Sequence, residues 1–293
     1  MNRFAWLMRR EWMQHHRGWL ILAVVPAVIA LAVVPFGSVQ VDEVIGAPML
    51  AAMASTIYLM ALLSIALVGV MFDAPGLARR DRQDRSIEFW LSLPTGHAQS
   101  IAATILTNLF LMPLVVLLIS ALVAPAVAAL VVVKVLGAPA LSEIGLPGWI
   151  GFGLLVLLRE AIGLLLSLLW LSPLIMLAMA ASSWLKGWGV PAVAAAIGLA
   201  ALAQQQLTGQ KQIWETVLHW WHQSNEAALP LIRSGVPFKA LANSDDAMSM
   251  FGRWMLHDTG QLLRDAPSPA FAVALLVAAL GFWVLVWRRS QGR

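Results

Sequence analysis

The sequence predicts an all-α membrane protein with six transmembrane helices, an N-terminal amphipathic interfacial helix and an external helical loop between spans five and six. Composition gives the class, because 60% of the 293 residues are hydrophobic and 12% are charged, whereas soluble domains are about 45–50% apolar and about 25% charged. The apolar residues also gather in stretches close to the ~20 residues that a helix needs to cross a bilayer. We therefore take residues 1–293 as a single transmembrane domain.

The first element is an amphipathic arm over residues 1–17. Its apolar residues recur at helical spacing and oppose a polar face; the apolar set is Phe4, Leu7, Met8 and Trp12, and the polar set is Arg3, Arg9, Arg10 and Gln14. We expect a helix lying in the inner headgroup layer, with an ordinary extension of the first span as the alternative. The apolar run that follows has spanning length and no small-residue cleavage site, which predicts an uncleaved anchor.

Six apolar segments qualify or nearly qualify as spans: residues 18–36, 48–72, 101–123, 162–182, 190–205 and 270–287. The third can extend toward Val133, and the fifth is short and rich in alanine. Residues 149–160 are apolar as well, but one helix over 149–182 would be about 51 Å long at 1.5 Å per residue, well over the ~30 Å apolar core. We expect residues 149–160 to form a separate interfacial or re-entrant helix, or an external extension of the fourth span.

The basic residues predict that both termini face the cytoplasm. In that topology the cytoplasmic segments hold 12 basic and five acidic residues, a net charge of +7, and the remaining charges sum to −3. Basic residues favour the cytoplasmic side of membrane proteins. Because they are dispersed along the predicted membrane edges, we expect them to meet anionic lipid headgroups and not nucleic acid.

The longest polar region, residues 206–269, forms the predicted external loop. Two amphipathic helices are expected in it, near residues 211–232 and 245–263, and its tryptophans suggest a cap on the outer leaflet: Trp214, Trp220, Trp221 and Trp254. His219 and His222 are three residues apart, which can suit a metal. No convergent carboxylate accompanies them, so we favour interfacial packing. The adjacent His15 and His16 would point to different faces of a helix, which also argues against a metal pair.

Catalytic signatures are absent from the sequence. It contains no GxSxG, HExxH or GxxxxGK[ST] pattern, so we do not expect hydrolysis or nucleotide binding by this chain alone. It also contains no cysteine, which excludes disulfides and thiolate metal sites. Ionisable residues near the spans are functional suspects, but Asp73, Arg159 and Glu160 fall at span boundaries. We favour a structural role over a substrate site for Arg159 and Glu160.

Residues 79–97 join the second and third spans and read RRDRQDRSIEFWLSLPTGH. The first half is charged, and the second half places Ile87, Trp90, Leu91 and Pro94 at helix-like spacing. This pattern predicts a cytoplasmic coupling segment: a short helix whose apolar face docks onto a soluble partner. The alternative is that Phe89, Trp90 and Leu91 lie in the inner headgroup layer.

This segment resembles one in the permease subunits of bacterial type-2 ABC exporters. The matching residues are Asp84-Arg85-Ser86-Ile87, Phe89-Trp90 and Ser92-Leu93-Pro94, and the fourth span is similar through Leu169-Trp170-Leu171-Ser172-Pro173 and Ala180-Ala181-Ser182-Ser183-Trp184. About forty residues match closely and the rest only in layout. The family often has a lysine where this chain has Ala102-Ala103-Thr104, a departure from its pattern.

The resemblance implies a multi-pass permease of the bacterial inner membrane that works with a cytosolic P-loop ATPase subunit and a second permease copy or paralogue. ATP and magnesium would be held by the ATPase, so no cofactor is expected on this chain. The ATPase would bind Arg85, Ser86, Ile87, Glu88, Phe89, Trp90, Leu91 and Leu93. Apolar, nearly uncharged spans favour an amphipathic substrate, such as a lipid, peptide or drug.

Two other functions fit the sequence. A non-transporting scaffold or assembly protein would use its Trp-rich loop to bind a partner. A secondary transporter driven by an ion gradient would normally need ionisable residues or broken helices at the membrane midplane, and the spans offer few charges.

Overall fold

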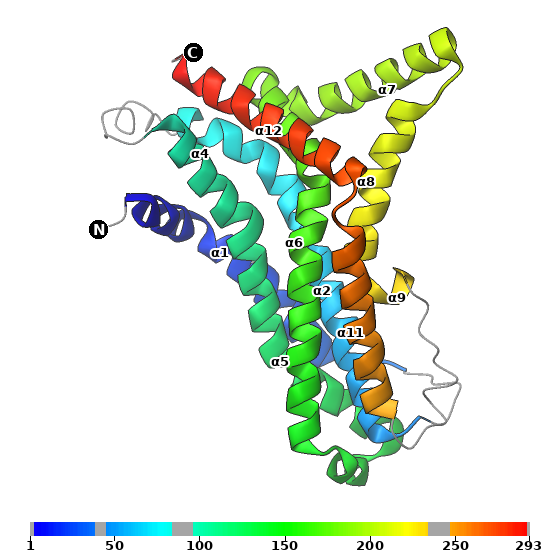
Figure 1. Cartoon of the computed structure of the whole chain (residues 1–293). Coiled ribbons are helices and arrows are strands. Elements are labelled where there is room, and N and C mark those ends of the chain that lie inside the picture. Colours follow the sequence, from blue (N-terminus) through cyan, green and yellow to red (C-terminus); the bar gives the residue numbers. More distant parts are fainter. Residues whose placement is uncertain (1–2, 39–44, 84–95, 234–246, 292–293) are drawn as a thin grey trace.

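The computed structural model describes residues 3–38, 45–83, 96–233 and 247–291, and every regular element within them is helical. Figure 1 shows long helices gathered around one central helix, with the N-terminus, the C-terminus and the start of α4 all in its upper half. The predicted all-α class is confirmed. The described residues contain five helical stretches that are long and apolar enough to cross a membrane, as a multi-pass membrane protein requires.

Helix α1 (Arg3–Val33) contains both the predicted arm and the first span. The helix continues through the expected boundary at Gly18, so the arm and the first span are not two separate helices. The position of the arm in the headgroup layer stays a prediction. Residues buried along α1 recur every four positions: Leu7, Glu11, His15, Trp19, Ala23 and Ala27. One narrow face thus packs on the bundle over most of the helix, and the remaining residues are partly or fully exposed.

Helix α2 (Ala47–Gln83) continues past the predicted end of the second span and runs through Pro75 into the charged run. The third membrane stretch is built from α4 (His97–Ile105), the π-helix η1 (Leu106–Leu111) and α5 (Met112–Leu136). It reaches beyond Val133, as the longer reading of this span predicts. A short 3-10 helix, η2 (Ala138–Glu143), connects it to the next element.

Helix α6 (Leu146–Leu185) is the central element, and helices α2, α12, α8, α7 and α11 all pack against it. Its 40 residues correspond to about 60 Å at 1.5 Å per residue. Residues 149–160 belong to this helix, so the separate or re-entrant helix is wrong and the extension of the fourth span is what forms.

After a three-residue 3-10 turn, η3 (Lys186–Trp188), the chain forms α7 (Gly189–Thr208). One candidate membrane stretch, Pro147–Thr208, therefore includes both the predicted fourth and fifth spans, and six spans are not confirmed. Helix α7 buries only Gly189. Figure 1 shows its far end extending away from the central helix.

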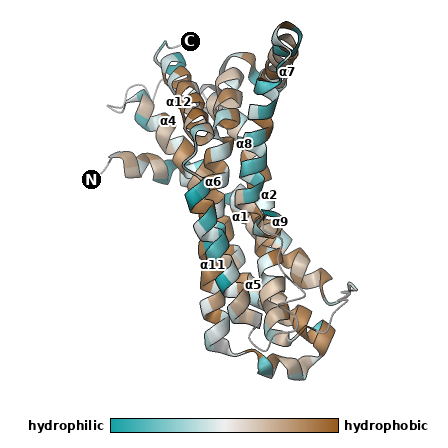
Figure 2. Cartoon of the chain, turned by 45° about the vertical axis from the view of Figure 1, so that its right-hand side comes forward, coloured by the Kyte–Doolittle hydropathy of each residue, from teal (hydrophilic) through white to brown (hydrophobic). Residues whose placement is uncertain are grey.

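The predicted loop helices are α8 (Gln212–Ala228), the short α9 (Pro230–Arg233) and α11 (Ala247–Asp265), followed by α12 (Pro269–Ser290). Helix α8 packs against α6, and Trp220 of α8 forms a buried cluster with Trp170 of α6 and Ala274 of α12. A separate Trp-rich cap is therefore not confirmed. Figure 2 shows hydrophilic stretches along α8 and α11. At Gly281 of α12, an added Cβ would lie 2.7 Å from Met176 Cβ, which shows how closely α12 approaches α6.

Candidate functional site

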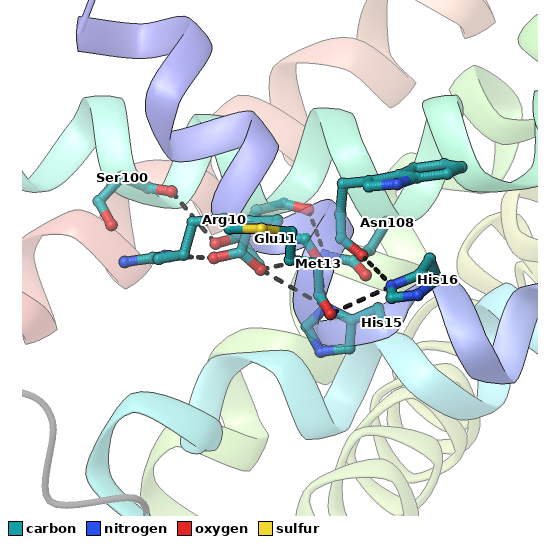
Figure 3. A network of polar contacts seen from close by, with 9 residues as sticks. Arg10, Glu11, Met13, His15, His16, Ser100 and Asn108 are labelled. Atoms are coloured by element: carbon teal, nitrogen blue, oxygen red, sulfur yellow. Dashed lines mark hydrogen bonds and ion pairs between the residues drawn. The ribbon is translucent and has the colours of Figure 1, made fainter.

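The predicted ATPase contacts, Arg85 to Leu93, lie outside the described residues, but the elements on either side of them are described. Helix α2 ends at Gln83, and α4 begins at His97. The connection therefore joins the end of α2 to the nine-residue α4, which continues into η1 and α5. The structure adds a polar network that ties α4 and η1 to the N-terminal arm, and Figure 3 shows this network.

Glu11 is the centre of this network. Its side chain is buried, with 3% of its surface exposed, although it lies on a helix that we expected at a membrane surface. One carboxylate oxygen, Oε1, pairs with the guanidinium of Arg10, and the other, Oε2, accepts a hydrogen bond of 3.4 Å from Asn108 Nδ2. These contacts supply the positive charge and the donor that a buried carboxylate needs.

Asn108 reaches Glu11 from the π-helical turn. Its amide also donates to the Thr104 carbonyl at 3.0 Å, and the Thr104 hydroxyl donates to the Ser100 carbonyl at 3.2 Å. A π-turn inserts one extra residue into a helix and is frequent at functional sites. Here it places a buried polar side chain opposite the arm, and Thr107 beside it is buried too.

His15 extends the network by one turn of α1. Its Nδ1 lies 2.9 Å from the Glu11 carbonyl oxygen and 3.8 Å from Glu11 Oε2. Because a carbonyl oxygen only accepts, Nδ1 is the donor in this contact. His16 instead stacks on Trp12 with ring centroids 6.1 Å apart. The two histidines thus point to different faces, as predicted.

A second buried polar cluster joins α6, α8, α9 and α11. Arg159 is fully buried; its Nε donates to Asp258 Oδ2 at 2.8 Å, and its Nη1 donates to the Ala227 carbonyl at 2.8 Å. Arg233 faces the other Asp258 oxygen at 3.9 Å and also pairs with Asp265. These contacts support the structural role that we expected for Arg159.

Glu160, next to Arg159, is fully buried as well. Among the described residues neither of its carboxylate oxygens has a hydrogen-bond partner. The contacts therefore do not give Glu160 the structural role that Arg159 has.

The histidines of α8 also take structural positions. His219 meets Trp170 edge to face at 5.6 Å, and His222 Nε2 lies 3.1 Å from Glu226 Oε1. Within the part of the chain that the structure describes, no group of three or more His, Cys, Asp or Glu is placed to hold a metal ion.

Sequence reasoning missed Glu11 and Asn108 as partners, although each carried a signal. Glu11 is the only acidic residue among the first 17, and Asn108 is the only amide side chain between residues 100 and 133. Polar residues that interrupt apolar patterns usually need partners when buried. Comparison of the chain with family models, with characterised proteins and with solved structures gave no match.

Proposed function

We propose that this chain is the permease subunit of an ATP-driven exporter of the type-2 ABC class in the bacterial inner membrane. It would transport an amphipathic substrate with energy from separate cytosolic ATPase subunits, and pair with a second permease copy or paralogue. The observation that carries the proposal is the DRSI-FW-SLP pattern of residues 84–94, placed between two long apolar helices.

The geometry around this segment supports a role in force transmission. Helix α2 continues from the membrane stretch to Gln83 without a break. A displacement of the segment would therefore move α2 as one rigid helix. On the other side, α4 and η1 are tied to the arm through Glu11 and Asn108. A movement of the segment would therefore displace α2, the third membrane stretch and the arm together.

Docking requires apolar anchors, and Phe89 and Trp90 are the candidates in the segment. Buried aromatic anchors at interfaces contribute about 2 kcal/mol or more each, which corresponds to roughly thirtyfold weaker binding when one is removed. The arginines of residues 79–85 would steer the encounter with an acidic partner surface or hold lipid phosphates.

The test is co-purification followed by reconstitution. The full chain, isolated by an affinity tag from its native membrane, should retain a P-loop ATPase that has no spans of its own. In proteoliposomes, the double variant Phe89→Ala, Trp90→Ala should lose stimulation of that ATPase while still inserting into the membrane. Trp188→Ala is the matched control, because Trp188 is a 75% exposed tryptophan on the same predicted face. Unchanged stimulation in the double variant would exclude docking through this segment.

A second candidate, a transporter driven by an ion gradient, is favoured by one observation. Glu160 is a fully buried carboxyl inside a candidate membrane stretch, and such residues often mark ion pathways. The same proteoliposomes separate the two functions. Transport that needs a proton or sodium gradient and is indifferent to ATP would favour the secondary transporter.

A further inference from the structure

Glu160 is a carboxyl group that neither the ATP-driven export proposal nor the ion-pair cluster of Arg159 uses. Its side chain is fully buried in α6, and neither of its oxygens has a hydrogen-bond partner among the described residues. It also lies inside a candidate membrane stretch. An ionisable side chain at such a depth is costly, so the form in which it is held there needs a physical explanation.

Glu160 belongs to an apolar stripe of α6. Val156 lies one turn before it and Leu164 one turn after it, and both are completely buried. Side chains four residues apart share a face of a helix. Val156 shares a cluster with Leu59 of α2 and Leu117 of α5, and Leu164 belongs to a second cluster that the same helices help to form. The face that carries Glu160 is therefore packed against α2 and α5.

The nearest charged groups belong to another face of α6. Arg159 donates to Asp258 of α11 and to the Ala227 carbonyl, and consecutive residues of an α-helix are about 100° apart around its axis. An ionised Glu160 would be attracted by Arg159 and repelled by Asp258. The two effects oppose each other, so this pair does not supply the counter-charge that a buried carboxylate needs.

Helices α2 and α5 do not supply a counter-charge either. Residues 47–72 and 98–133 contain no acidic or basic side chain. Tyr58 is the one titratable group in these ranges, and its buried hydroxyl also has no partner among the described residues. The buried hydroxyl of Ser120 donates to a carbonyl oxygen of its own helix. An ionised carboxylate only accepts hydrogen bonds, and none of these donors is bonded to Glu160.

Protonation removes this cost. An ionised carboxylate without partners in apolar surroundings is so unfavourable that the group becomes neutral instead, because burial disfavours the charged form of an acid. The neutral carboxyl also gains an O–H donor. The surroundings of Glu160 therefore favour a carboxylic acid over a carboxylate.

We propose that Glu160 is a proton-binding site: a carboxylic acid that keeps its proton at neutral pH and is shielded from water by α2 and α5. The proton exchanges only when these helices separate from α6. An ionised Glu160 cannot be buried again without a partner, so a lost proton must be taken up again before the bundle closes. The site goes beyond the proposed export function and does not depend on an ATPase partner.

The experiment is infrared spectroscopy of the purified full chain in nanodiscs of ether-linked phospholipids, which have no ester carbonyls. A protonated carboxyl absorbs at a higher frequency than a carboxylate or an amide, and heavy-isotope labelling of the glutamate carboxyl carbons lowers that frequency. We expect a carboxylic acid band at neutral pH that responds to this labelling and is lost completely in Glu160→Gln. Persistence of the whole band in a folded Glu160→Gln protein would overturn the proposal.

Variants assign the band. Glu226→Gln is the matched control, because the Glu226 side chain is 25% exposed and lies 3.1 Å from His222, so the band should remain. Loss of the band in this control would place the proton on another residue and overturn the proposal. If Glu160→Gln failed to fold, Glu160→Met must remove the same band. A wild-type spectrum without any band that responds to glutamate labelling would overturn the proposal without a variant.

Transfer to deuterium oxide tests the shielding from water. The proton of an exposed carboxyl exchanges during mixing, whereas a buried group exchanges only when the structure around it opens. The Glu160 band should therefore keep its frequency after mixing and shift slowly. A shift completed during mixing would show contact with water and overturn the shielded site. None of these results involves ATPase stimulation, so failure of this proposal leaves the transport proposal to its own test.

Discussion

Removal of the Asp258 charge should destabilise the folded protein more than any other single change in the buried ion-pair cluster. Arg159 is fully buried, and its guanidinium has Asp258 at 2.8 Å as its anionic partner. In Asp258→Asn that guanidinium keeps its hydrogen bond to Ala227 but loses the opposing charge. Breaking a buried pair from one side costs about 3–5 kcal/mol, and we expect this loss in the free energy of unfolding.

Removal of the Arg159 charge should lower the free energy of unfolding by a smaller amount. In Arg159→Met, Asp258 still faces Arg233 at 3.9 Å, so its charge keeps a cationic neighbour. The main loss is the donor to the Ala227 carbonyl, and a buried polar group left without a partner costs about 1–3 kcal/mol. The double variant Arg159→Met, Asp258→Asn should lose less stability than the two single losses added together, because it leaves no isolated charge at the Arg159–Asp258 contact.

The measurement is the free energy of unfolding in mixed micelles, from titration with a denaturing detergent and a helix-content readout. Arg264→Met is the control, since Arg264 is exposed on the same helix as Asp258 and surface changes usually stay within about 0.5 kcal/mol. A loss in Asp258→Asn no greater than in the control would refute the reasoning. The reasoning would also be refuted if the stability loss in the double variant equalled the sum of the losses in the two single variants.

Three further changes test other contacts. Glu160→Met should raise the free energy of unfolding by about 1–3 kcal/mol, because it replaces a buried carboxyl that accepts no hydrogen bond within the described residues. The same titration measures this change. A lower free energy of unfolding in the variant would show that Glu160 has a stabilising partner. Asn108→Leu removes the amide that donates to Glu11, so backbone hydrogen exchange in the arm should accelerate; unaltered exchange would show that other contacts hold the arm. Gly281→Ala places a Cβ 2.7 Å from an α6 side chain and should cost about 1–3 kcal/mol through overpacking. Gly76→Ala meets open space and should cost nothing measurable by thermal unfolding, so equal effects of the two would contradict the close approach.

Local apolar patterns predicted most of the helices. The predicted spans at residues 48–72 and 270–287 lie within α2 and α12, since a long apolar run determines its own helix. Two amphipathic helices were also expected where α8 and α11 form. These features depend on neighbours within a few turns, which is the range that periodicity reports.

Features that depend on distant partners could not be predicted in the same way. Arg159 was interpreted as a boundary position, yet it is fully buried inside α6, where Asp258, 99 residues away, neutralises it. Glu11 lies in the arm that was expected at a membrane surface, yet it is buried against Asn108, 97 residues away. A charged residue in a sequence does not reveal whether a counter-charge lies elsewhere in the fold, and that partner decides whether the charge can be buried.

The wide turn of η1 has a consequence for the way the third membrane stretch can respond to its neighbours. An α-helix rotates about 100° per residue, so one residue added within a turn gives the segments before and after it different rotational phases. The segment before the turn directs Ile101 and Ile105 into the bundle, and the segment after it does the same with Met112 and Val116. If the π-turn became an ordinary α-helical turn, α4 would rotate relative to α5 while both segments stayed helical. The chain therefore contains, next to the arm, one turn whose geometry sets the rotation of α4 relative to α5.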